Sequence, residues 1–143
     1  MSSASFEDVL AKNGRLIYTN VGISMMPLIR PGRDLMVIEP VEGRLRRLDV
    51  PLYRRDDGKY ILHRVLWTRR DSYIICGDNQ SVPEFGVEDR QIIGVLRAVI
   101  RDGEEISMDD PRVRAYAHLW CDLFPIRSAI LWVNRKIRRR LHG

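Results

Sequence analysis

Short apolar stretches separated by turn residues fill most of the first 110 positions. A helix is expected over residues 5–13, because Ser5 and Asp8 have the spacing of a capping box and Asn13-Gly14 is a stop signal. Strands are expected over 15–21, 34–38, 49–54, 59–68, 72–76 and 91–101. Tight turns such as Asp56-Asp57-Gly58 join these stretches without intervening helices. The pattern predicts a mainly β fold, built as a twisted antiparallel sheet or a partly closed barrel.

The last third of the chain has a helical pattern, which Pro125 divides into two pieces. In the second piece apolar residues recur at spacings of three and four, so that they share one face: Ile126, Ile130, Val133, Ile137 and Leu141. We therefore expect a β domain over 1–110 and an amphipathic helical tail over 111–143.

The net charge of +5 belongs to this tail. Six basic residues and no acidic one follow position 126, which leaves about −1 for the rest of the chain. Such a helix, over 126–141, suits an anionic membrane surface. The alternative is that the apolar stripe packs on the sheet and the arginines are solvated. A nucleic-acid partner is not expected, because no helix-turn-helix or other reading module is apparent.

Other classes of protein are excluded by what the sequence lacks. The longest uncharged run, 16–29, has 14 residues, whereas a membrane-spanning helix needs about 20. No secretory leader is visible at the N-terminus, so we expect a cytoplasmic protein, peripheral on the inner membrane face if the tail binds lipid. The two cysteines and three histidines form no ligand pattern, so neither a metal nor another cofactor is expected.

Three short segments contain the residue types of a hydrolytic site. Ser24 lies in the segment Gly-Ile-Ser-Met-Met-Pro over 22–27, where a turn can expose its hydroxyl as a nucleophile. His63 lies within an apolar stretch and has the residue type of a general base at neutral pH. Asp78 follows a strand and has the residue type that orients an imidazole. Taken singly, each has an ordinary alternative: a turn serine, a half-buried histidine and an Asx turn.

Together the three segments resemble the conserved boxes of type I signal peptidases, a family related to the LexA-like serine peptidases. The Ser-Met-x-Pro segment with Pro-Gly-Arg-Asp at 31–34 resembles the nucleophile box, and His-Arg-Val, 39 residues after Ser24, resembles the histidine form found in endoplasmic-reticulum and archaeal enzymes. Gly-Asp-Asn at 77–79 resembles a later box. The resemblance implies Ser24 as nucleophile, His63 as base, and Met25 and Pro27 as substrate contacts. The third catalytic member is Asp78, with Glu84 or Asp89 as alternatives.

The lysines favour the histidine form of the family. Bacterial signal peptidases and LexA-type repressors resemble each other in using a buried lysine as base, but Lys12, Lys59 and Lys136 all lie in polar surroundings. We therefore expect a serine endopeptidase that cleaves a precursor or exported peptide with a Ser-His dyad or triad. The alternative is a catalytically inactive, membrane-associated binding module with the same fold.

Overall fold

The N-terminal helix forms where the sequence predicts it. In the computed structural model, which describes residues 5–19 and 24–142, helix α1 (Phe6–Asn13) begins at a capping box between Ser5 and Asp8. It ends at Gly14, whose left-handed conformation is readily accessible to glycine. Strand β1 (Leu16–Thr19) follows. Positions 20–21 of the strand expected over 15–21, and positions 22–23 of the serine segment, lie outside the described residues.

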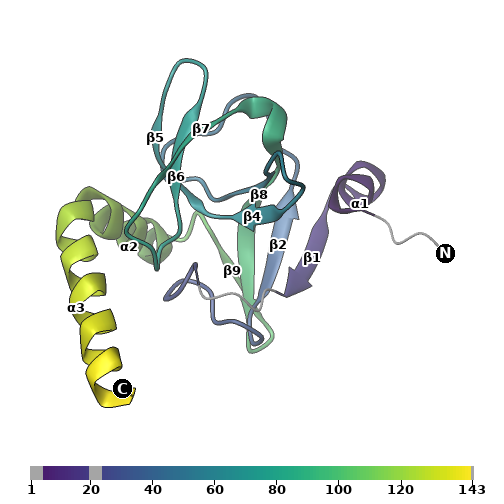
Figure 1. Ribbon diagram of the computed structural model, residues 1–143. Coiled ribbons are helices and arrows are strands. Elements are labelled where there is room, and N and C mark those ends of the chain that lie inside the picture. The colour runs from purple at the N-terminus through teal and green to yellow at the C-terminus, as the bar shows by residue number, and fades with distance from the viewer. Residues whose placement is uncertain (1–4, 20–23, 143) are drawn as a thin grey trace.

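A six-stranded antiparallel sheet forms the body of the molecule (Figure 1). Its long central strand, β8 (Ile92–Arg101), pairs with β2 (Leu35–Glu39) on one edge. On the other edge β8 pairs first with β3 (Pro51–Arg54) and then with β9 (Glu104–Ser107). Strand β1 continues the sheet beyond β2, and β4 (Tyr60–Leu62) continues it beyond β3.

A second, three-stranded antiparallel sheet contains β5 (Arg64–Thr68), β6 (Tyr73–Cys76) and β7 (Glu84–Val87). The single strand expected over 59–68 is therefore two strands, β4 in the first sheet and β5 in the second, with His63 between them. A 3-10 turn, Asp89–Gln91, leads from β7 into β8. The result is mainly β, with an antiparallel sheet curled into a half-barrel, as the turn pattern predicts.

Two apolar clusters hold the sheets. The first lies between α1 and the six-stranded sheet and includes Leu10, Ile38 and Leu96. The second joins the two sheets, because Tyr53 and Val95 of the first sheet pack with residues such as Ile75 of the second. Alternating strand residues direct these side chains to the inner face.

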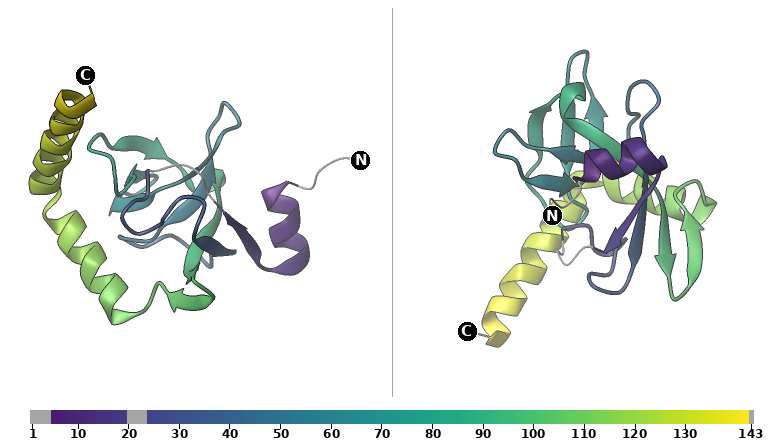
Figure 2. Two further views of the ribbon diagram at one scale, coloured as in Figure 1. Left: turned by 90° about the horizontal axis from the view of Figure 1, so that it is seen from below. Right: turned by 90° about the vertical axis from the view of Figure 1, so that its right-hand side faces the viewer.

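The helical region comprises α2 (Pro111–Asp122) and α3 (Phe124–His142), which separate near Pro125 as predicted. Helix α2 packs on the domain, since Ala117 and Cys121 are buried and Cys121 contacts Leu66 and Cys76. The packed unit therefore extends beyond the expected boundary at 110/111, and α3 is the part that projects away from the sheets (Figures 1 and 2). None of the described helices is long and apolar enough to span a membrane.

The face of helix α3 that contacts the domain is not the face with the apolar stripe. Phe124 contacts the ring of Trp67 at 6.3 Å between centroids, and Arg135 donates a 3.1 Å hydrogen bond to the Ser81 hydroxyl. Ser128 and Leu131, at helical spacing between these two residues, are half-buried. The stripe lies opposite, and its five residues are 45% to 75% exposed: Ile126, Ile130, Val133, Ile137 and Leu141. The alternative in which this stripe packs on the sheet is therefore wrong.

Candidate functional site

The Ser24 segment is tied by its backbone to the turn that follows β6. The Ser24 carbonyl accepts a 2.8 Å hydrogen bond from the Asn79 N–H. The next side chain, Met25, is buried, and its sulfur accepts a 3.4 Å hydrogen bond from the Asp78 N–H. Two of the three sequence segments are thus brought together, although they are more than 50 positions apart.

A buried carboxylate fixes the other end of the segment. Asp34 accepts hydrogen bonds from the backbone N–H of Arg30, at 2.9 Å, and from the guanidinium of Arg101, at 2.7 Å. Arg101 also donates a 2.7 Å hydrogen bond to the Leu28 carbonyl. Burial acts to raise the pKa of Asp34, but the hydrogen bonds from Arg101 and Arg30 outweigh burial and hold the pKa well below its ordinary value. The turn after Ser24 is therefore anchored at both ends.

Gly77 is the residue at which the serine and histidine segments meet. A Cβ built on Gly77 would lie 2.5 Å from the Ser24 carbonyl oxygen and 3.1 Å from Cδ2 of His63. No side chain fits there without displacing one of these groups. The structure therefore brings the Ser24 backbone and the His63 ring next to the same glycine.

His63 lies at the point where the chain passes from one sheet to the other. It is 6% exposed, and the ring of Tyr53 packs against it edge-on, 6.4 Å between centroids. Burial, and then the charge of Arg55, lower the pKa of His63 to about 4, against the opposing effects of Glu84 and Asp78. The imidazole is therefore neutral at pH 7, and one of its ring nitrogens has a lone pair that can accept a proton.

No hydrogen bond joins the Ser24 hydroxyl to the His63 ring among the residues that the structure describes, and none joins His63 to a carboxylate. Burial and charge alone account for the altered pKa of His63. In enzymes without substrate, catalytic hydrogen bonds are often long and tighten on binding. The two segments are neighbours at Gly77, and in the described part of the chain their side chains are not hydrogen-bonded to each other.

Asp78 is held by a different partner than the expected one. Its carboxylate accepts hydrogen bonds from Arg64, at 2.9 and 3.0 Å, and from the Tyr116 hydroxyl at 2.7 Å. Its carbonyl accepts a 2.7 Å hydrogen bond from Trp120. Arg64 and Asp78 are 1% and 0% exposed. Asp78 is thus the acidic member of a buried ion pair, and the structure shows no hydrogen bond from its carboxylate to the His63 ring that would give it the expected orienting role.

The two alternative carboxylates also have other partners. Glu84 accepts 2.8 Å hydrogen bonds from Tyr53 and Arg55, and these bonds lower its pKa against the opposing effect of burial. Asp89 accepts a hydrogen bond from Tyr73 and pairs with an exposed arginine. Of the two, Glu84 is the one whose charge reaches His63.

The expected substrate contacts divide into a core residue and a surface residue. Met25 is 1% exposed and belongs to the first apolar cluster, and its sulfur accepts the hydrogen bond from the Asp78 N–H. It therefore anchors the Ser24 turn and presents no surface to a substrate. Pro27 is exposed.

Two side chains of α2 hold Asp78 in place and were not identified by the sequence motifs. Tyr116 and Trp120 both bind Asp78, one through its carboxylate and one through its carbonyl. Their spacing of four places them on one face of the helix, and two aromatic residues on one face predict that this face packs against the domain. That signal does not show which residue the face would meet.

Two further observations bear on the chemistry of the site. All three lysines, Lys12, Lys59 and Lys136, are exposed, so none has the burial that would make it a base. Within residues 5–19 and 24–142, no group of three or more His, Cys, Asp or Glu side chains is placed to hold a metal ion.

Comparisons with protein-family models, with curated proteins and with solved structures found no match to this chain.

Proposed function

We propose that the protein is a serine endopeptidase of the signal-peptidase type, with Ser24 as nucleophile and His63 as general base. The observation that carries the proposal is the close approach of the Ser24 backbone and of a buried, neutral His63 to the same residue, Gly77. A nucleophile and a base held together by a rigid turn meet the first requirement of covalent catalysis. The curled antiparallel sheet and the order of the three segments support the same family of folds.

The reaction follows from these roles. Ser24 Oγ attacks the carbonyl carbon of the peptide while a ring nitrogen of His63 takes its proton, and the scissile C–N bond breaks as the proton passes to the leaving amine. Water then attacks the acyl-serine ester, again through His63, and releases the carboxylate. Since the described residues include no carboxylate hydrogen-bonded to His63, the pair acts as a dyad, and packing against Tyr53 orients the ring.

A serine-directed covalent probe tests this function without knowledge of the substrate. A fluorophosphonate should label the full chain once, and labelling should vanish in Ser24→Ala and fall at least tenfold in His63→Ala. Ser72→Ala, a partly buried serine at the opposite end of β6, is the matched control and should label normally. Labelling that persists in Ser24→Ala, or none in the wild type, would favour a non-catalytic binding module with this fold.

We propose in addition that α3 holds the protein on an anionic membrane surface. Its apolar stripe faces away from the domain, and its sequence contains six cations and no acidic residue. Exposed apolar side chains beside cations are the features of a helix that lies in a bilayer interface. Attraction to anionic lipid contributes about 1 kcal/mol per cation near the surface.

Vesicle sedimentation tests the membrane proposal. The full chain should sediment with vesicles that contain anionic phosphatidylglycerol, and a variant with Arg138, Arg139 and Arg140 changed to Glu should bind at least tenfold more weakly. The exposed pair Arg69 and Arg70, changed to Glu on the β5–β6 turn, is the control and should lose at most twofold. Equal losses in the two variants, or self-association through the stripe without sedimentation, would refute a membrane role.

A further inference from the structure

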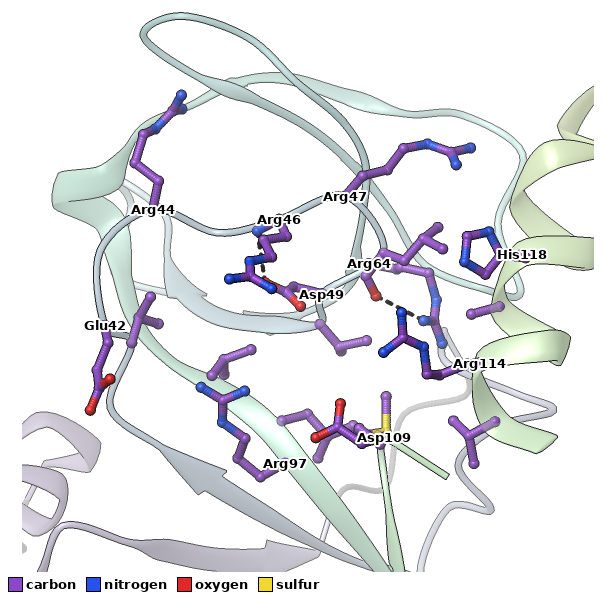
Figure 3. A pocket seen from close by; sticks show the side chains of 18 residues that line it. Glu42, Arg44, Arg46, Arg47, Asp49, Arg64, Arg97, Asp109, Arg114 and His118 are labelled. Carbon is purple, nitrogen blue, oxygen red and sulfur yellow. Dashed lines mark hydrogen bonds between the residues drawn. The ribbon is translucent and has the colours of Figure 1, made fainter. Parts of the chain in front are cut away.

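A cleft lined by arginines lies apart from the Ser24 turn. It has a volume of about 520 Å³ and is bordered by the 41–50 segment, β8 and residues 113–118 of α2 (Figure 3). This volume is within the range of ligand-binding sites and far above that of a water molecule or a single small ion. Arg64 forms part of its wall and pairs with Asp78 on the side of the site, so the buried ion pair separates the cleft from Ser24 and His63.

The lining of the cleft contains more cations than anions. Six arginines contribute to it, against three acidic residues: Arg44, Arg46, Arg47, Arg64, Arg97 and Arg114, with Glu42, Asp49 and Asp109. Positive charges that lie close together on a concave surface raise the local concentration of anions. Such a site favours a ligand with several negative groups.

Four of the six arginines already have partners. Arg64 pairs with Asp78, Arg47 with Asp122, Arg44 with Asp89 and Arg97 with Glu39. These ion pairs neutralise four of the six arginines. The two arginines that remain are Arg46 and Arg114.

Arg46 and Arg114 have no ion pair or side-chain hydrogen bond with any residue that the structure describes, and both are exposed. They come from different elements, the 41–50 segment and α2, and Figure 3 shows both guanidinium groups turned toward the space between those elements. Glu42 points away from that space in the same view. Asp49, whose carboxylate accepts a hydrogen bond from the Arg46 N–H, and Asp109 also line the cleft, but the structure shows no ion pair between either of them and Arg46 or Arg114. Two converging guanidinium groups without an ion pair are a ready site for carboxylates, which arginine binds through paired hydrogen bonds.

We propose that this cleft binds an acidic segment of a peptide, with carboxylates on Arg46 and Arg114. A segment with two or more Asp or Glu residues can reach both arginines and fill the cleft, whereas a single phosphate would leave most of the volume empty. The choice of a peptide over another polyanion rests on the proposed peptidase function. The binding of anions rests on the cleft alone.

Fluorescence anisotropy tests the proposal with the Ser24→Ala protein, which cannot turn over a peptide. The probe is a labelled peptide with four Glu residues in an Ala-Gly background, and its matched control carries Gln at the same four positions. The Glu peptide should bind at least tenfold more tightly than the Gln peptide. Its affinity should fall as salt is added, because salt screens exposed charges.

The variant Arg46→Gln/Arg114→Gln should lower the affinity for the Glu peptide at least tenfold. Arg69→Gln/Arg70→Gln removes the same net charge from the exposed β5–β6 turn and should change the affinity by less than twofold. All four side chains are exposed, so the thermal midpoints of both variants should match that of the parent. Equal binding of the Glu and Gln peptides, or equal losses in the two variants, would overturn the proposal.

Other anions separate the remaining explanations. Tight binding of an oligo(U) RNA that depends on Arg46 and Arg114, with no binding of the Glu peptide, would make this a nucleic-acid site and overturn the proposal. Binding of inorganic pyrophosphate without the peptide would overturn it as a small-anion site. Wild-type protein that binds the Glu peptide but is not labelled at Ser24 would refute the peptidase and leave the cleft standing, and the reverse result would refute the cleft alone.

Discussion

Replacing Asp78 with Asn removes one charge from the most deeply buried ion pair of the molecule's described part. The Asp78 carboxylate accepts two hydrogen bonds from Arg64 and one from Tyr116, and both members of the pair are almost fully buried. Asparagine has nearly the same shape, so the change leaves the packing in place. It leaves the Arg64 guanidinium inside the protein without a counter-charge.

The expected loss in the free energy of unfolding is about 3–5 kcal/mol. This is the range for removing one partner of a buried pair, because the remaining charge keeps its desolvation penalty and loses its attraction. Small domains are stable by about 5–15 kcal/mol in total, so the loss is a large part of the whole. An exposed pair gives the contrast: Asp122, which pairs with Arg47, is half-exposed, and Asp122→Asn should cost less than about 1 kcal/mol.

Urea denaturation followed by far-UV circular dichroism measures these differences. Tryptophan fluorescence is less suitable, because Trp120 donates a hydrogen bond to the Asp78 carbonyl and would report on the substitution directly. The midpoint of Asp78→Asn should fall far below those of the wild type and of Asp122→Asn, with an unchanged slope. A loss of less than about 1 kcal/mol for Asp78→Asn would show that the Arg64 charge is solvated, and it would refute the buried-pair reasoning.

Three further predictions concern the surroundings of the site. Because burial lowers the pKa of His63 to about 4, the folded protein binds fewer protons than the unfolded chain between pH 6.5 and 4, so stability should fall by up to about 3 kcal/mol as pH decreases through this window. This loss should disappear in His63→Gln when urea midpoints are compared across pH, and an equal loss in the variant would contradict it. The rate of probe labelling should likewise rise with pH near 4, and a rise near 6.5 would mean that His63 is not buried as described. Gly77→Ala should reduce labelling of Ser24 at least tenfold, since its Cβ would lie 2.5 Å from the Ser24 carbonyl, and normal labelling would show that the turn yields. Tyr116→Phe removes one hydrogen bond to Asp78 and should cost about 1 kcal/mol in urea unfolding while labelling is retained, and lost labelling would give Tyr116 a role in the site.

The elements that sequence analysis identifies are those specified by local signals. The helix at 6–13 follows from its capping box, and the hairpin of β3 and β4 from the turn residues Asp56-Asp57-Gly58. Strands β7 and β9 were not predicted, because Glu84–Val87 and Glu104–Ser107 contain few apolar residues and form by pairing with β6 and β8. Their formation depends on long-range pairing, which a local pattern does not contain.

The same distinction applies to the site. The segments around Ser24, His63 and Gly77 could be placed together by motif order, because each carries its own residue signal. The partner of Asp78 could not be predicted, since Arg64 lies on a strand whose sheet is decided by the break at His63. Tyr116, 38 positions away on α2, has no sequence feature that connects it with Asp78.

The order of residues along β5 and β6 gives the buried ion pair a positioning role. Arg64 directly follows His63, and Asp78 directly follows Gly77, so the Arg64–Asp78 pair holds the base opposite the glycine that contacts Ser24. A buried ion pair adds little net stability compared with apolar residues of similar volume. The double replacement Arg64→Met/Asp78→Leu should therefore recover much of the stability that Asp78→Asn loses, while labelling of Ser24 stays low. Recovery of both stability and labelling would show instead that apolar packing alone positions His63.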